Sequence, residues 1–207
     1  VLSCYTRVNA SFMLDIHSHI LPGIDDGASD LNASLALCRE LRAQGITQVV
    51  ATPHWCSPRF SVQEEAIYRT WNALAEAAAS INGLTLALGA EHHYSGLQDV
   101  KAFVASLRPL GDSRCVLIEL PDDHLPKSIW DALWAVRAAK FTPILAHPER
   151  CKGLRASDPG LRDFVNSGGL LQLTLGHLIG GNGFRMLWRS RSLLRRFGPS
   201  CLIASDS

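Results

Sequence analysis

Imidazole and carboxylate side chains stand at the ends of several short apolar segments of this sequence. Segment 14–17 leads into His17 and His19, and five later segments end on a histidine, a glutamate or an aspartate in the same way. Such side chains are ligands for divalent metals, and a cluster of this size indicates a site for several cations rather than one zinc ion. The candidate ligands are His17, His19, Asp26, His54, Glu91, Glu119, His147 and Asp206.

Spacing supports this interpretation. His17 and His19 are two residues apart, so on a strand their imidazoles point to the same side and can bind one ion. Asp26 follows in a glycine-containing loop that can fold back over the strand end. Glu91 and Glu119 can each bridge two cations, because a carboxylate has two oxygens to share. A single histidine of this kind is usually structural, but the placement of the whole set at strand ends favours metal binding.

The elements that position these residues alternate along the chain. Short segments that are apolar on both faces predict buried parallel strands, and amphipathic segments between them predict helices. We expect Asp30 or Ser29 to cap the first helix and Ser61 to open the second through a capping box. The predicted strands are 14–17, 49–52, 85–90, 116–120, 143–146, 170–174 and 202–204, and the predicted helices are 30–44, 61–80, 127–140, 161–166 and 184–197.

This order predicts an α/β fold. Six of the seven predicted strands contribute a ligand, which favours a closed (β/α) barrel over a doubly wound sheet, where the ligand lies at one switch point. The sequence has 207 residues, and we expect residues 13–207 to form one domain. The extension at 1–12 that precedes it is expected to be disordered. No predicted helix follows the last strand, so we expect the segment that closes the barrel to be missing.

Composition excludes several classes of partner. The formal net charge of +1 does not favour nucleic acid or acidic membranes, and no run of 18 apolar residues predicts a membrane span. The N-terminus lacks the apolar segment of a signal peptide. The six cysteines have wide, irregular spacings, so we expect reduced thiols and a cytoplasmic location.

The motifs resemble those of the PHP (polymerase and histidinol phosphatase) superfamily. Residues 15–28, 89–91 and 146–150 are similar to the PHP-type tyrosine-protein phosphatases of bacterial capsule and exopolysaccharide loci. The resemblance covers residues 13–207. It implies a distorted seven-stranded barrel, up to three divalent ions that are usually Mn²⁺, and a phosphotyrosine-bearing tail of a bacterial tyrosine kinase as the partner. It does not define the oligomeric state.

The resemblance also groups the ligands. It implies that His17, His19, Glu91 and Asp206 hold the first ion, that Glu91, Glu119 and His147 hold the second, and that Asp26 and His54 hold the third. A further histidine two positions after Asp206 would complete the third site, so we expect two firmly bound ions and a weakly bound third. Arg150 is the candidate catalytic residue, which clamps the phosphate oxygens.

Two alternatives stay open at this point. One is a small-molecule phosphomonoesterase of the histidinol-phosphate phosphatase type, and the other is a non-catalytic regulator that binds a kinase. The remaining histidines near strand ends are His92, His93, His124 and His177, for which loop or supporting roles are favoured. The arginines of segment 184–197 are expected to be a solvated face, or else a docking surface for an acidic tail.

Overall fold

The computed structural model describes residues 12–55, 57, 59, 60 and 62–207. Within these residues nine strands form two sheets, and all strand pairs are parallel. One sheet has the order β1-β2-β4 and the other the order β3-β5-β6-β7-β8-β9. The strands are β1 (Leu14–Ser18), β2 (Gln48–Ala51), β3 (His54–Trp55), β4 (Thr85–Leu88), β5 (Glu91–His93), β6 (Cys115–Glu119), β7 (Thr142–Ala146), β8 (Leu170–Thr174) and β9 (Cys201–Ala204).

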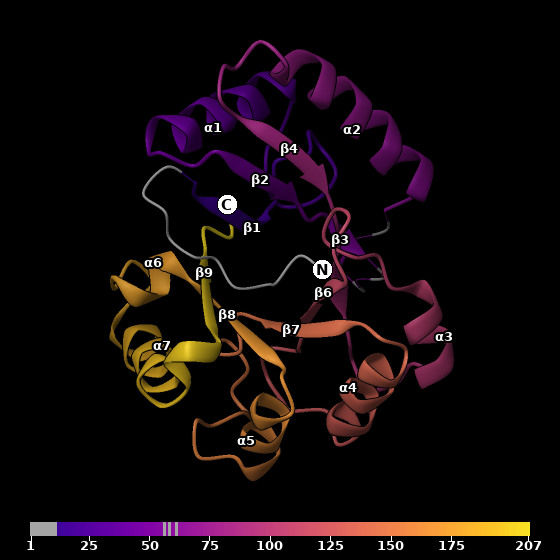
Figure 1. Ribbon diagram of the computed structural model, residues 1–207, viewed down its shortest axis with the longest axis vertical. Helices are drawn as coiled ribbons and strands as arrows, with labels where there is room; N and C mark the ends of the chain where they lie inside the picture. Colours follow the sequence, from indigo (N-terminus) through magenta and orange to yellow (C-terminus); the bar gives the residue numbers. More distant parts are fainter. Residues whose placement is uncertain (1–11, 56, 58, 61) are drawn as a thin grey trace.

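The helices lie on the outside of the strands, which surround the centre of the molecule (Figure 1). This is the arrangement of a (β/α) barrel, in which helices cover the outer face of a ring of parallel strands. The helices are α1 (Leu31–Ala43), α2 (Glu64–Ala78), α3 (Val100–Ser106), α4 (Ile129–Ala138), α5 (Pro159–Asn166), α6 (Leu175–Leu178) and α7 (Phe184–Phe197), and a 3-10 turn at Gly198–Ser200 leads into β9.

The predicted α/β fold is confirmed, and its distortion has a local cause. Two of the six predicted ligand-bearing strands are each followed by a second short strand: β3 follows β2 after Thr52-Pro53, and β5 follows β4 after Gly89-Ala90. A proline cannot donate to a strand ladder, so Pro53 interrupts the pairing. The chain then continues in the other sheet, where His54 pairs with Glu91. The segments that carry His54 and Glu91 therefore pass from the first sheet into the second.

The ring is joined between β1 and β9 by individual contacts rather than by a strand ladder. The amide of Asp206 donates to the carbonyl of His17 over 2.9 Å, and the amide of Ser205 donates to the carboxylate of Asp15 over 3.1 Å. The C-terminal residues consequently lie beside the end of β1, near the centre of the ring in Figure 1.

The helix predictions were partly correct. Asp30 caps α1 as expected, since its carboxylate accepts from the amide of Ala33, and α7 spans the predicted residues 184–197. The predicted start of the second helix was wrong, because α2 begins at Glu64 after Gln63 as N-cap; Ser61 itself lies outside the described residues. The helices α3 and α6 were not predicted.

Two further expectations concern the cysteines and the N-terminal segment. The side chains of Cys38, Cys151 and Cys201 are free thiols, but Cys115 is disulfide-bonded, so the expectation of uniformly reduced cysteines was wrong. The predicted extension at 1–12 lies outside the described residues except for Phe12, which is exposed.

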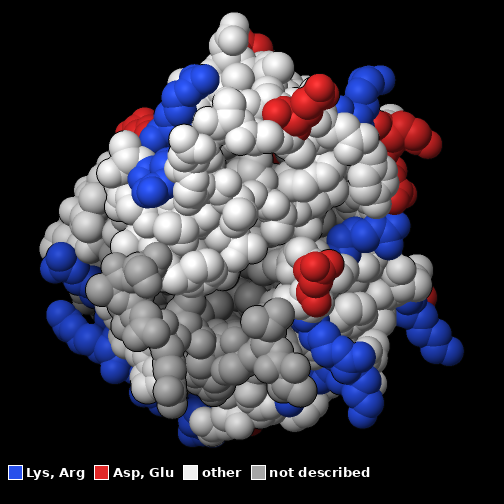
Figure 2. Space-filling view, turned by 45° about the horizontal axis from the view of Figure 1, so that its top comes forward, with Lys and Arg blue, Asp and Glu red and all other residues white. Residues whose placement is uncertain are grey.

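The surface shows no single dominant charge. On the face drawn in Figure 2, Lys and Arg side chains are interspersed with Asp and Glu side chains, consistent with the small net charge. None of the helices in the described part of the chain has the length and apolar character needed to cross a bilayer.

Candidate metal centre

The candidate ligands meet at one end of the barrel, where β1, β2, β4, β6, β7 and β9 have their carboxyl ends. His17 lies in β1 and His19 just after it, His54 begins β3, and Glu91 begins β5. Glu119 is the last residue of β6, His147 follows β7 directly, and Asp206 is the second residue after β9. The carboxyl ends of parallel strands in a barrel face the same side, so residues distant in the sequence meet there.

Glu91 occupies the middle of this cluster. Its Oε1 lies 2.7 Å from Nε2 of His147 and 3.5 Å from Nε2 of His17. Its Oε2 lies 3.2 Å from Nδ1 of His54 and 3.5 Å from Nε2 of His19. The carboxylate is fully buried, so each of its oxygens faces two imidazoles and no bulk water.

The ligand atoms form four overlapping groups of three, and within each group they lie within 4.8 Å of one another. Glu91 shares one group with His17 and His19, as the predicted first site requires. Glu119 with Glu91, and Asp26 with His54, also agree with the predicted grouping, whereas His147 lies with His17 and Asp206 rather than with Glu91 and Glu119. Asp26 joins His19 and His54, and it is the exposed member of the set.

The loop after β1 brings Asp26 back over the strand end. Its shape depends on Gly27, where an added Cβ would lie 1.9 Å from the carbonyl oxygen of His19. The amide of Ala28 donates to the same carbonyl over 3.1 Å. No other residue type allows this close approach of two backbone segments. Asp26 Oδ1 consequently lies 3.5 Å from Nε2 of His54.

Hydrogen bonds behind the ligands orient two of the imidazoles. Nδ1 of His17 lies 2.9 Å from Oε1 of Gln172, and Nδ1 of His19 lies 2.9 Å from Oδ2 of Asp25. An acceptor at Nδ1 fixes the tautomer that leaves the Nε2 lone pair directed at the centre, an arrangement common behind metal-binding histidines. Asp25 therefore supports both His19 and the loop, where its Oδ1 accepts from the amide of Gly27.

Gln172 and His93 also support the candidate ligands, and the sequence analysis did not single out Gln172. Gln172 is fully buried in β8, and its Oε1 also accepts from the amide of His147 over 3.1 Å. The signal for it was a single polar residue in the otherwise apolar run 170–173. His93, for which a loop or supporting role was expected, lies in β5 with Nδ1 2.8 Å from Oε2 of Glu119.

The electrostatics of the cluster favour positive charge. Burial disfavours the imidazolium of His19, but hydrogen bonds to Asp25 and Glu91 outweigh it and raise the pKa of His19 to about 11. The pKa of His17 is also raised, because the charge of Glu91 overcomes the effect of burial. Burial acts to raise the pKa of Glu91, but the charge of His17 and the hydrogen bond to His147 hold that pKa well below its usual range.

The donor set fits divalent cations. Nδ1 of His54 and Oε2 of Glu91 are buried and have no hydrogen-bond partner among the described residues. A buried polar atom without a partner is costly, and a coordinated cation would satisfy both atoms. Oxygen and imidazole nitrogen without thiolate is a ligand combination that suits manganese and related metals. His17, His19, His54, Glu91, Glu119, His147, Asp206 and Asp26 would hold the ions.

Arg150 lines the cavity above the cluster together with His19, His54 and Asp206. Its guanidinium donates to Oδ2 of Asp206, and the hydroxyl of Thr174 donates to the same oxygen over 3.1 Å. Burial opposes ionisation of Asp206, but the positive charges of His17, His147 and Arg150 lower its pKa. A larger cavity between α4 and α5 contains none of the candidate ligands.

Two histidines considered from the sequence lie away from the cluster. His124 is exposed, with Nδ1 2.7 Å from a carboxylate oxygen of Asp123. His177 lies in α6 rather than in a loop, is buried, and has Nδ1 2.9 Å from Oε1 of Glu149.

Residues 13–207 match the family described as "Capsular polysaccharide synthesis, CpsB/CapC". The sequence is 31% identical over 180 residues to the putative tyrosine-protein phosphatase CapC of Staphylococcus aureus, covering 84% of this chain and 70% of that protein. It is 31% identical over 177 residues to the tyrosine-protein phosphatase YwqE of Bacillus subtilis, covering 81% of this chain and 66% of that protein.

A solved structure has the same architecture. It comes from a study of YwqE from Bacillus subtilis and CpsB from Streptococcus pneumoniae, described as unique metal-dependent tyrosine phosphatases. The TM-score is 0.79 at 31% identity, with 94% of this chain and 79% of that chain covered.

Proposed function

This chain belongs to the CpsB/CapC family of capsular polysaccharide synthesis, and from that premise we propose that it is a metal-dependent protein-tyrosine phosphatase. The observation that carries the proposal is the buried carboxylate of Glu91, whose two oxygens face four imidazoles in a cluster built from six strand ends. Such a cluster provides concentrated positive charge only when divalent cations bind it, which is the condition for hydrolysing a phosphate dianion.

Bound divalent cations offset the charge of the phosphate and make a water molecule acidic enough to act as nucleophile near neutral pH. We propose Mn²⁺ as the metal and a stoichiometry of up to three ions. The chain contributes the orientation of the ligands, through Gln172 behind His17 and Asp25 behind His19. It also keeps bulk water from Glu91, so electrostatic interactions there are stronger than at the surface.

Arg150 is the proposed catalytic residue outside the ligand set. Its guanidinium lies in the cavity wall, held by Asp206 at the centre. An arginine at this position can donate two parallel hydrogen bonds to phosphate oxygens and stabilise the charge that develops on them. A tyrosyl leaving group, with a pKa of about 10, departs more readily than a serine alkoxide, so a strong general acid is not required.

The proposed substrate is the phosphotyrosine-bearing tail of a bacterial tyrosine kinase, and the proposed location is the cytoplasm. The relatives named as tyrosine-protein phosphatases support the substrate class. The cavity beside Arg150 is lined almost entirely by polar side chains, which suits a phosphoryl group.

A comparison of substrates tests this proposal. We expect the manganese-loaded protein to release phosphate from a phosphotyrosyl peptide with a kcat/KM at least tenfold above that for the matched phosphoseryl peptide and for histidinol phosphate. A preference for histidinol phosphate would identify the protein as a small-molecule phosphomonoesterase. Absence of turnover on all three, with tight binding to a tyrosine kinase, would identify a regulator.

A further inference from the structure

The turn after β7 carries Arg150 and has an unusual backbone conformation. His147, the first residue of the turn, has a φ of 27°, in the left-handed region that L-residues rarely adopt. The amide of Arg150 donates back to the carbonyl of His147 over 2.9 Å. Such a conformation persists only when the surrounding structure holds it. The contacts that hold this turn therefore affect where the Arg150 side chain lies.

One side of the turn is held by Arg189 from α7. Its guanidinium donates to the carbonyl oxygens of Glu149 and Cys151, and to that of Leu154 over 2.9 Å. These three carbonyls belong to residues 149–154, the segment that contains Arg150. A planar guanidinium with five donors can bind several acceptors at once, whereas an ammonium is a compact point charge.

Within the described residues, no other arginine of α7 donates a hydrogen bond to this turn. Arg191 donates to the carbonyl of Leu178 in α6, and Arg195 is exposed. The contacts of Arg189 are therefore specific to its position and do not follow from the general basic character of the helix.

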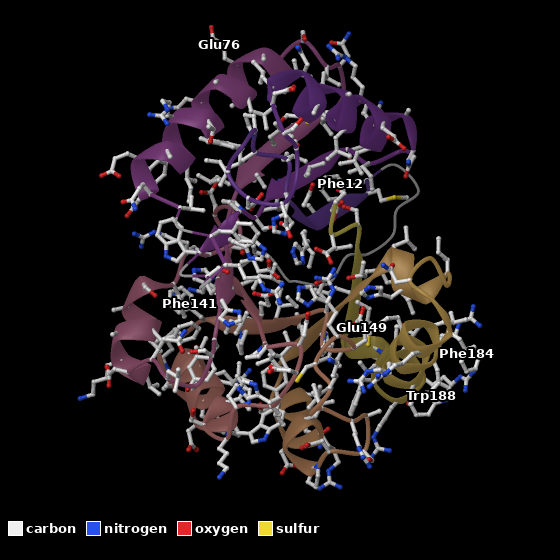
Figure 3. The ribbon with its side chains drawn as sticks, turned by 180° about the vertical axis from the view of Figure 1, so that it is seen from behind. Phe12, Glu76, Phe141, Glu149, Phe184 and Trp188 are labelled. Carbon is white, nitrogen blue, oxygen red and sulfur yellow. The ribbon has the colours of Figure 1, made fainter. Side chains whose placement is uncertain are left out.

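The other side of the turn is held by a buried hydrogen bond between a carboxylate and an imidazole. The carboxylate of Glu149 is fully buried, and its Oε1 lies 2.9 Å both from the amide of Thr174 and from Nδ1 of His177. Figure 3 shows Glu149 between the centre of the molecule and α7, whereas Phe184 and Trp188 lie on the outer side of that helix. The hydroxyl of Thr174 in turn donates to Oδ2 of Asp206, the oxygen that also accepts from Arg150.

We propose that Arg189 and the Glu149–His177 pair form a brace that positions Arg150 for catalysis. The brace consists of these three side chains, and none of them lines the cavity above the cluster. They are positioning residues, since they act on the turn and through it on the guanidinium of Arg150. The inference rests on the proposed function, because the brace is inferred to position Arg150, the residue proposed to bind the phosphate.

The first test compares Arg189→Gln with Arg195→Gln, an exposed arginine on the same helix. Arg189→Gln should lower kcat on a phosphotyrosyl peptide by about 10- to 100-fold, since small displacements of a catalytic group have effects of this size. The manganese content, measured by elemental analysis, should match that of the unchanged protein. Arg195→Gln should retain kcat. Equal kcat for both variants would overturn the proposal.

The second test asks whether the effect passes through Arg150. In an Arg150→Ala background, Arg189→Gln should change kcat by less than about threefold, because residues that act as a unit are not additive. If Arg189→Gln lowers kcat by the same factor in both backgrounds, the brace acts on something other than Arg150 and the proposal is wrong.

The third test does not depend on activity and covers the case in which Arg189→Gln fails to fold. Hydrogen exchange of residues 147–154 should be faster in Arg189→Gln and in His177→Leu than in Arg195→Gln. His177→Asn, which keeps a donor near the position of Nδ1, should exchange more slowly than His177→Leu. Unaltered exchange in all variants would refute the brace. Absence of phosphotyrosine hydrolysis by the unchanged protein, with the exchange pattern as expected, would refute only the proposed function.

Discussion

Nε2 of His147 lies 2.7 Å from Oε1 of Glu91, although the two residues are 56 positions apart in the sequence. The contact joins the first residue of β5 to the residue after the carboxyl end of β7, and these two strands do not pair with each other. It exists because β6 lies between them in parallel register, with Glu119 opposite Ala146. The order of strands therefore determines which candidate ligands lie close enough to share a cation.

Removal of the phosphate clamp should separate catalysis from metal binding. Arg150→Ala should lower kcat by roughly 10²–10³, the usual effect of deleting one donor that stabilises transition-state charge. The manganese content should stay nearly unchanged, since no ligand is lost. Parallel measurement of turnover and bound metal checks this expectation. Loss of metal to the same extent as turnover would make Arg150 a structural support of Asp206.

Asp25 offers a test of the residues behind the ligands. Asp25→Asn should weaken manganese affinity by about 10- to 100-fold, because the carboxylate at Nδ1 of His19 orients that imidazole and increases its basicity. Activity should return at high manganese concentration, which distinguishes this variant from one lacking a ligand. Asp123→Asn, at an exposed carboxylate paired only with His124, is the matched control. An affinity equal to that of the control would show that Asp25 shapes only the loop.

Manganese affinity should rise with pH through the neutral range. The pKa of His19 is raised to about 11 in the metal-free protein, so this imidazole carries a proton at pH 7 that must leave before Nε2 can bind a cation. Affinity should therefore increase about tenfold per pH unit for each proton released. Titration calorimetry in two buffers of different ionisation enthalpy measures the number of protons. If manganese binds between pH 6 and 8 without release of a proton, the prediction is wrong.

His92 should make the metal-free protein sensitive to acid. Burial lowers the pKa of His92 from 6.5 to about 4, and the amide of Arg108 donates to its Nε2 over 2.9 Å, which requires the neutral ring. Because the folded-state pKa lies below the unfolded one, the stabilisation is complete above pH 6.5 and is lost as the pH falls towards 4. A shift of this size corresponds to on the order of 3 kcal/mol.

The corresponding experiment compares the unfolding free energy of the unchanged protein and His92→Gln in excess chelator from pH 7 to 4. The difference between the two should narrow as the pH falls. A constant difference over this range would show that His92 stays neutral in the unfolded chain or ionises freely in the folded one.

Much of the ligand set could be predicted because each ligand follows an apolar strand, and strand ends are local signals. The ligand pairs could not be predicted in the same way, since His54 meets Glu91 only after Pro53 directs the chain into the second sheet. Gln172 and Asp25 support histidines in other segments, and their partners depend on strand order. The brace around Arg150 was not predicted either, because segment 184–197 indicates an amphipathic helix without indicating which arginine faces inward.

The central claim is that the cluster around Glu91 acts by holding divalent cations for phosphotyrosine hydrolysis. The most direct measurement is kcat on a phosphotyrosyl peptide after chelation and after return of manganese, for the unchanged protein, Glu91→Gln and Glu76→Gln. Glu76 projects from the outer side of α2 (Figure 3) and serves as the matched control. Chelation should abolish turnover, and manganese should restore it in the unchanged protein and Glu76→Gln but not in Glu91→Gln. Full turnover in excess chelator, or full restoration in Glu91→Gln, would contradict the account.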